Sequence, residues 1–339
     1  MKKHIIKLSI FIIIFLSSVS RLFSFGGLLT DLQGNVNSFS EKMAKSLPFN
    51  STMGLNWSDA YIGKFFPAFP PHIGIGASAG FTTMDFGTFN DLTNMFGINL
   101  PIDIPLGFPL LGYTTEARIG GLFFPFDIGI KYGTLGDNFN TNSIPFFNKN
   151  IDANMKYLLY GADIRFAVFK PKVMPVRICI GIGYNRLEGG ISATLSDFNG
   201  SFDFEDYAIN IVAPDLNLIW ETECLELKTQ ISFPISFVTP YAGAGISYAR
   251  SKAGYQINSP VSITGDTETI KQVLAELGIN IDINDLSKGF HSTKEVNGFN
   301  ARLYGGVSLN LSVVKLDLTA MYNIFGGEWG GTIGLRLQL

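Results

Sequence analysis

The residues best suited to catalysis or metal binding are few and scattered in this chain. Of its histidines, His4 lies in a predicted signal peptide (residues 1–24, described below), His72 starts a predicted strand and His291 lies in a predicted loop. Nucleophilic catalysis needs a base that a third group orients, and a zinc site needs clustered His or Cys ligands. No such set can be assembled here, so the sequence predicts a protein that is not an enzyme and has no catalytic residue, metal or cofactor.

An acidic stretch and two cysteines remain to be placed. Residues 197–206 offer oxygen ligands for Ca²⁺, but their spacing matches no known calcium loop, and a solvated acidic loop is the simpler interpretation. Cys179 and Cys224 fall on strands predicted to be neighbours, and export permits a disulfide. Cys179 lies close to its short turn, whereas Cys224 lies about ten residues from its own. The two cysteines are therefore expected at different levels along their strands, which disfavours a disulfide between them.

Composition narrows the class of protein. Hydrophobic residues make up 46% of the 339 residues and charged residues only 16%, against ~25% charged residues in soluble domains. The formal net charge of -3 offers no basic surface to nucleic acid. Disorder, a coiled coil and nucleic-acid binding are therefore excluded.

Residues 1–24 have the features of a secretory signal peptide. Lys2, Lys3 and Lys7 precede an apolar run, and small residues follow it up to Ser24. The run is shorter than the ~20 residues that a spanning helix needs. Cleavage is expected near Ser24, and the alternative is an uncleaved anchor, because Arg21 crowds the cleavage region.

From residue 71 onward, stretches with period-two alternation are separated by turns and loops. In each stretch one face is apolar and uncharged. The opposite faces carry the charged residues, which are Glu116, Arg118, Asp127, Lys131, Asp163, Arg165, Arg177, Glu226, Lys228, Arg302, Lys315, Asp317 and Arg336. One stretch departs from this pattern: between Trp220 and Leu225 the apolar phase switches, which predicts a β-bulge or a strand break at 221–224.

The placement of the charges favours a membrane barrel over a soluble sandwich, although alternation alone fits both. The stretches are long, their apolar faces end in aromatics, and their opposite faces carry both signs of charge. In hydrocarbon only helices and closed barrels pair every backbone group, and no apolar helix of spanning length follows the signal. The sequence thus predicts an all-β protein, a closed antiparallel transmembrane β-barrel over 71–339, with the charged residues lining its lumen.

The connections give the strand number and the orientation. Short ones at 124–125, 170–174, 234–238 and 312–313 alternate with longer ones at 85–112, 133–153, 188–215, 251–297 and 324–329. This predicts about ten strands, with periplasmic short turns and C-terminus and with long outer loops. An interfacial aromatic girdle is then expected near the outer strand ends, at Phe81, Tyr132, Tyr184, Tyr248 and Tyr322.

Two segments carry a family resemblance: Thr-Pro-Tyr-Ala-Gly-Ala-Gly at 239–245 and Gly-Leu-Arg-Leu-Gln-Leu at 334–339. With them the chain resembles bacterial outer-membrane β-barrel proteins of the porin-like superfamily, and it is similar to spirochaete-type outer-membrane barrels. The resemblance implies a bacterial outer-membrane location, contact with outer-membrane lipid, and a C-terminal strand read by the barrel-assembly machinery. The chain departs from the common pattern by ending in Leu339 instead of Phe.

Residues 25–70 have two interpretations: a plug inside the barrel, or one or two further strands that would make twelve. Inward glycines, such as Gly74 and Gly243, favour a close-packed inner element. Short helices are predicted at 41–47, after a capping box at 38–41, and in the outer loops at 88–96 and 266–278.

These features predict a narrow or partly occluded channel or transport protein for small solutes. Cations outnumber acids among the lumen residues, so an open path should favour anions. The alternative is that these charges form salt bridges with one another and only fill the lumen. A second hypothesis is a non-transporting structural or adhesive surface protein that acts through its long loops. A third is a soluble exported β protein.

Overall fold

The computed structural model describes residues 34–62, 71–85, 87, 106–121, 125–140, 153–169, 176–194, 200–204, 207–211, 215–258, 261–264 and 290–339. The predicted signal peptide and the predicted loop helices lie outside these residues.

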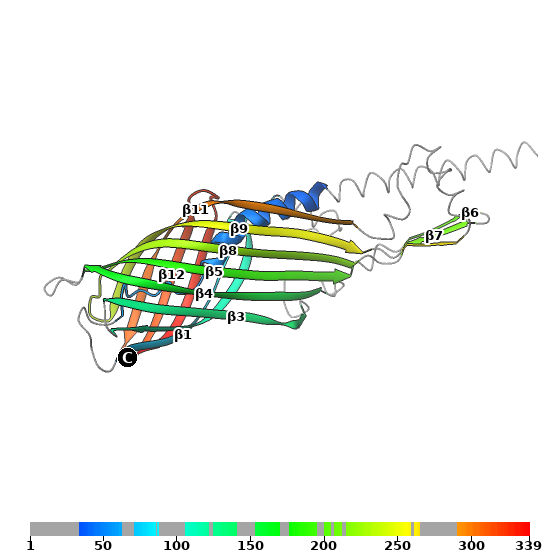
Figure 1. Ribbon diagram of the computed structural model, residues 1–339. Coiled ribbons are helices and arrows are strands. Elements are labelled where there is room, and N and C mark those ends of the chain that lie inside the picture. The colour runs from blue at the N-terminus through cyan, green and yellow to red at the C-terminus, as the bar shows by residue number, and fades with distance from the viewer. Residues whose placement is uncertain are drawn as a thin grey trace, which may run out of the picture.

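The described residues form a closed barrel of ten antiparallel strands (Figure 1). The strands are β1 (His72–Met84), β2 (Phe108–Gly120), β3 (Phe126–Asn140), β4 (Ala153–Phe169), β5 (Arg177–Thr194), β8 (Asp215–Ser232), β9 (Val238–Asn258), β11 (Phe290–Leu311), β12 (Val314–Asn323) and β13 (Trp329–Gln338). Each strand pairs with its sequence neighbour in the ring, and β13 pairs with β1 to close it. The prediction of a ten-stranded barrel is confirmed. The twelve-stranded alternative is wrong, because a closed ring has no free edge for a further strand.

A second, small sheet lies beyond one end of the barrel (Figure 1). It consists of β6 (Gly200–Phe204), β7 (Tyr207–Ile211) and β10 (Val261–Thr264), in the order β10-β7-β6. Part of the acidic stretch that was predicted to be a loop therefore forms strand β6.

The two ends of the barrel differ. The turns at 233–237 and 312–313 and the C-terminus lie at one end, here called the turn end; the long connections leave from the other, the loop end (Figure 1). Strands β9 and β11 have 21 and 22 residues, whereas β12 and β13 have 10 each. One side of the wall therefore rises well beyond the other. The predicted loops at 188–215 and 251–297 were too long, because strands continue into both.

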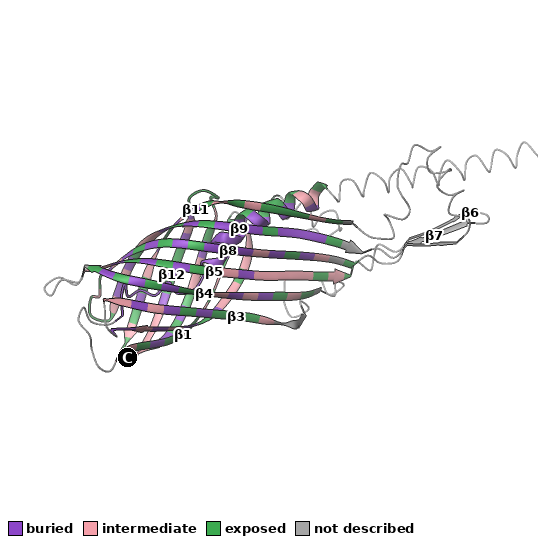
Figure 2. Ribbon diagram, in the orientation of Figure 1, coloured by how far each residue is buried: buried purple, intermediate pink, exposed green. Residues whose placement is uncertain are grey.

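The outward face of the wall is apolar over its middle, and its residues form the exposed rows that are green in Figure 2. Outward Ile182 and Ile246, for example, are 54% and 58% exposed. An uncharged apolar band on a closed ring is the surface that hydrocarbon requires of a spanning β-protein. Among the described residues, no helix is long and apolar enough to cross a membrane.

The two faces of the wall exchange character at one row of residues. Along β8 the outward side chains change from Leu227 and Leu225 to Glu223, while the inward ones change from Glu226 to the buried Trp220. Glu223 pairs in register with Arg186 on β5 and with Arg250 on β9, and the Arg186 Nη1 atom lies 2.5 Å from a Glu223 carboxylate oxygen. Beyond this row the outward face carries the charged residues Glu188, Glu221 and Lys252, and the inward face becomes apolar.

This exchange explains the phase switch in β8. The strand is continuous and in regular register with both neighbours from Asp215 to Ser232. The predicted bulge is therefore wrong. The apolar residues change face because the environment outside the wall changes from lipid to water, not because the backbone is interrupted.

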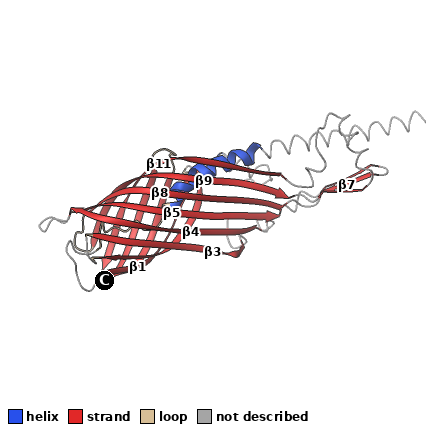
Figure 3. Cartoon of the chain, viewed as in Figure 1, coloured by secondary structure: helices blue, strands red, loops and turns tan. Residues whose placement is uncertain are grey.

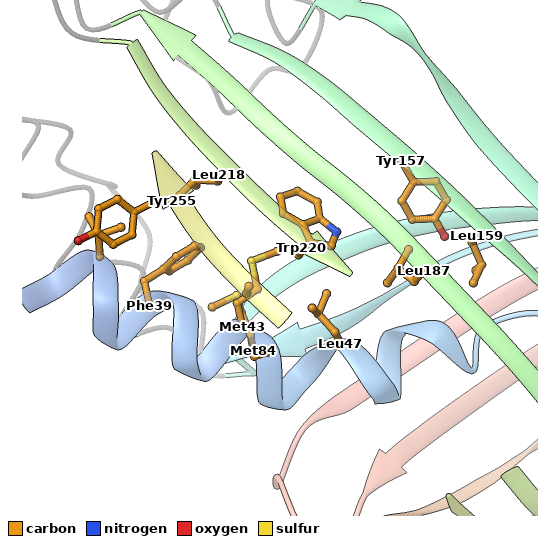
Figure 4. Packing of buried hydrophobic residues seen from close by; sticks show 13 residues of the cluster. Phe39, Met43, Leu47, Met84, Tyr157, Leu159, Leu187, Leu218, Trp220 and Tyr255 are labelled. Atoms are coloured by element: carbon orange, nitrogen blue, oxygen red, sulfur yellow. The ribbon is translucent and has the colours of Figure 1, made fainter. Parts of the chain in front are cut away.

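A helix over residues 34–51 packs on the apolar inner face of the raised wall (Figures 3 and 4). Val36, Phe39, Met43 and Leu47 recur at helical spacing and face the wall. Their cluster includes Met84, Tyr157, Leu159, Leu187, Leu218, Trp220, Ala253 and Tyr255. The helix is longer than the predicted 41–47, and Ser38 lies within it instead of capping it, because the wall continues to supply apolar contacts toward the loop end.

Candidate functional site in the barrel lumen

Residues 34–62, here called the plug segment, run through the lumen from the loop end to the turn end. Near the loop end, the Lys42 ammonium lies 3.4 Å from the Asp85 carboxylate, and the Ser46 hydroxyl donates to Glu328. Further down, Asn50 Nδ2 donates to the hydroxyl of Thr82 at 2.8 Å. The segment therefore follows β1 downward from its last residues.

In the turn half of the barrel, wall side chains bind the backbone of the plug segment. Glu116 accepts from the backbone amide of Leu55 at 2.9 Å and from Trp57 Nε1 at 2.5 Å. The ammonium of Lys131 donates to the carbonyl oxygen of Ser51 at 2.7 Å and to that of Met53. These contacts fix the end of the helix and the chain that follows it, where Leu55 and Trp57 belong to no helix or strand.

The same pattern continues toward the turn end. Gln230 Nε2 donates to the carbonyl of Trp57 at 2.8 Å, and Ser232 Oγ accepts from the Ala60 amide at 3.2 Å. The amide of Ile62 donates to Asp127 at 2.8 Å. A Cβ at Gly120 would lie 2.0 Å from the Ile62 carbonyl oxygen, so only glycine admits this close backbone approach.

Three wall cations converge on one carboxylate of the plug segment. Asp59 Oδ2 lies 2.7 Å from Lys315 Nζ and 3.0 Å from Arg336 Nη2, and Asp59 Oδ1 lies 3.3 Å from Arg177 Nη1. These three ion pairs bind the plug segment to the wall electrostatically.

The remaining buried charges pair across the strands of the wall. Asp127 bridges Arg118 at 2.5 Å and Arg165 at 2.8 Å, and Asp163 lies 2.6 Å from Lys228. On the opposite side, Glu226 binds Arg302 at 2.6 Å. The excess of cations in the wall is thus taken up by Asp59 and by plug carbonyl groups.

The structure places the predicted lumen-lining residues as follows. Buried and turned inward are Glu116, Arg118, Asp127, Lys131, Asp163, Arg165, Glu226, Lys228, Arg302, Asp317 and Arg336. Arg177 and Lys315 also contact Asp59, but their side chains are 32% and 13% exposed. The predicted girdle residues Phe81, Tyr132, Tyr184 and Tyr248 are exposed on the outward face, and Tyr322 is half-buried against Trp329.

Sequence reasoning missed the residues of the plug segment that make the site. The guanidinium groups of Arg336 and Arg118 both lie over the ring of Trp57, at 4.8 Å and 5.5 Å from its centroid. Neither Asp59 nor Gln230 carried a signal, because an isolated acid or amide has no period to reveal its partner. The available clue was Trp57, a large aromatic residue in the segment between the signal and the barrel.

The cysteines do not pair. Cys179 and Cys224 are free and buried, and the register sets Cys179 opposite Gln230 but Cys224 opposite Asn185. Within the described part of the chain, no group of three or more His, Cys, Asp or Glu residues is placed to bind a metal ion.

The closed ring and its uncharged outward band make the chain an integral outer-membrane β-barrel. Its fold is similar to the outer-membrane protease OmpT from Escherichia coli (9% identity, TM-score 0.41, covering 83% of this chain and 100% of that one). It is also similar to the translocator domain of the autotransporter NalP from Neisseria meningitidis (9% identity, TM-score 0.41, 91% and 98%). A major outer membrane protein from Thermus thermophilus matches at 9% identity and a TM-score of 0.31, over 79% and 99%.

These likenesses concern the fold alone. No match is found among curated proteins. A family model, described as Lsa36-like, matches residues 32–339, which include the plug segment and the whole barrel. The chain therefore belongs to the Lsa36-like family.

Proposed function

We propose that the barrel is closed to solutes in its resting state by the plug segment, and that the protein acts at the cell surface through the segments at its loop end. The observation that carries the proposal is the binding of plug backbone by Glu116, Lys131 and Gln230 from three different strands. These side chains occupy the lumen positions that would otherwise line a water path. The protein is then a surface platform, and the small sheet formed by β6, β7 and β10 belongs to its displayed part.

A gated channel is the second candidate. The plug segment is held in the turn half by polar contacts, and Arg177 and Lys315 remain partly exposed there. Polar contacts can be exchanged for water, so displacement of the segment would leave a lumen lined by charged residues with an excess of cations. An open barrel of this kind would carry small solutes and favour anions.

Conductance in planar bilayers tests the closed state. The full mature protein is expected to give no steady conductance, and a variant lacking residues 25–66 is expected to give anion-selective channels. Heat-modifiable gel migration serves as the folding control for both proteins. Equal conductance of the two folded proteins would refute the plug.

The native cysteines provide a second readout that needs no deletion. Cys224 is 0% exposed, and its thiol lies beside the hydroxyl of Ser51 in the plug segment. It is expected to resist maleimide in the folded protein and to react after heat unfolding. Rapid labelling of the folded protein would show that the lumen is open.

Two partners follow from the barrel itself and belong to the same proposal. Outer-membrane lipid contacts the apolar outward band, and the barrel-assembly machinery reads β13, the last strand, before it pairs with β1.

A further inference from the structure

The plug segment has a fixed direction relative to the barrel. β1 starts at the turn end with His72 and reaches the loop end at Met84. The partners of the plug segment follow β1 in reverse: Lys42 contacts Asp85, Asn50 contacts Thr82, and Trp57 lies against Gly74. The plug segment therefore runs through the lumen from the loop end, at Lys42, to the turn end, at Ile62.

The helix begins beyond the hydrocarbon layer. Figure 4 shows Phe39 and Met43 of the helix beside Tyr255 and Trp220 of the raised wall. Tyr255 and Trp220 lie on the loop side of the row that contains Arg186, Glu223 and Arg250, where the outward face becomes charged. The first described residue, Gly34, thus lies at the loop end of the barrel.

The apolar inner face of the raised wall explains why the helix lies at the loop end. Leu218, Trp220, Tyr255 and Leu187 form an apolar surface that would face water without the helix. The opposite side of the helix is exposed at Ser38, Glu41, Lys42 and Lys45. Such an amphipathic helix covers the wall from the loop side and presents its polar side to solvent.

We infer that the plug segment enters the barrel from outside the cell, so that Gly34 lies on the cell-surface side of the outer membrane. The lumen in the turn half is filled by residues 50–62, whose backbone is bound on several sides. A chain that started in the periplasm would have to pass this filled half a second time to reach Gly34. The signal segment must therefore be removed, because an N-terminus retained in the inner membrane cannot reach the loop end.

Site-specific labelling on intact cells tests the inference with described residues. Ser38→Cys and Glu41→Cys place a thiol on the exposed side of the helix at the loop end. Ser236→Cys places one in the exposed turn between β8 and β9 at the turn end. The wild type, whose own cysteines are buried, is the background control.

A membrane-impermeant maleimide is expected to label the Ser38→Cys and Glu41→Cys proteins on intact cells. The Ser236→Cys protein should react only after the outer membrane is permeabilised, and the wild type in neither case. Protection of both helix positions on intact cells would overturn the inference, provided that Ser236→Cys reacts after permeabilisation.

An epitope inserted before Gly34 gives an independent answer. Antibody should bind it on intact cells, and the mature protein should lack residues 1–24. Binding only after permeabilisation, or a folded barrel that keeps its signal segment, would contradict the inference. Neither result depends on whether the barrel conducts, so this inference can fail while the closed-barrel proposal stands.

Discussion

Gly74 on β1 leaves the space that the indole ring of Trp57 occupies. A Cβ at position 74 would lie 2.6 Å from Cζ3 of that ring, closer than real Cβ contacts allow. The ring cannot easily retreat, because Nε1 donates to Glu116 and Arg336 lies over the ring. This inward glycine is therefore needed to make room for the plug segment more than for strand pairing.

Gly74→Ala is accordingly expected to displace Trp57. Overpacking of this kind costs about 1–3 kcal/mol, so the variant should unfold at lower temperature and expose Cys224 to maleimide in the folded barrel. Gly183→Ala is the matched control, since a Cβ there would lie 3.3 Å from its nearest neighbour, Asp163 of the wall. Equal maleimide labelling of Cys224 in the two variants would show that Gly74 is not needed to hold Trp57 in place.

The second prediction concerns Asp59. Asp59→Asn removes the carboxylate that Lys315, Arg336 and Arg177 share, and breaking a buried charge pair costs roughly 3–5 kcal/mol. Denaturant unfolding monitored by gel migration should show the loss. Asp85→Asn removes the partner of Lys42 in a pair whose side chains are 48% and 49% exposed, and about 0–1 kcal/mol is expected there. Equal effects from the two variants would argue against Asp59 as the anchor.

A third prediction follows from Glu328, which accepts from Ser46 of the helix and from Asn323, the last residue of β12. Partial burial raises the pKa of Glu328 above its ordinary value, although both hydrogen bonds oppose the shift. A raised folded-state pKa means that the contribution is full below the unfolded value, ~4.3 for a glutamate, and declines as pH rises through the folded value. Glu328→Gln should keep the contact and flatten the dependence of stability on pH just above that range. If the free energy of unfolding of this variant depends on pH as it does in the wild type, Glu328 is not the source of that dependence.

The alternation of residues in the spanning strands was sufficient to predict the barrel, its strand number and the inward charges, because lipid imposes a strict period on the outward face. The raised part of the wall was harder. There Trp220 and Leu218 face inward while Glu223 faces outward. This reverses the rule that holds around Leu225, where apolar residues face outward and charged residues inward. When one rule is applied to the whole strand, the reversal is interpreted as a bulge. The exchange can be understood only when the helix that covers the inner face is known.

The plug segment shows a different limit. Its turn half binds through backbone amides and carbonyls, which every sequence offers alike, so contacts such as Lys131 to the Ser51 carbonyl leave no trace in residue type. The cation excess in the wall was visible, and it suggested an anion path. The structure shows that Asp59, one acid supplied from outside the strands, takes up three of those cations.

The last prediction concerns the apolar face that holds the helix. Trp220 is buried between the helix and the wall, whereas its neighbour Ile219 points outward and is 55% exposed. Trp220→Ala should cost about 3–5 kcal/mol, as truncation of a buried aromatic residue does, and that loss should fall mainly on the contact of the helix with the raised wall. Hydrogen exchange of the amides in 34–51 should accelerate, while amides of β8 within the apolar band keep their protection.

Ile219→Ala is the control for Trp220→Ala, because it alters the same strand on the side away from the helix. It should leave exchange in 34–51 unchanged. Equal acceleration in both variants would mean that the helix responds to the general stability of β8 and not to the packing of its inner face. Acceleration confined to Trp220→Ala would instead identify the raised wall and the helix as one folding unit, held together on the loop side of the membrane as a small water-soluble domain would be.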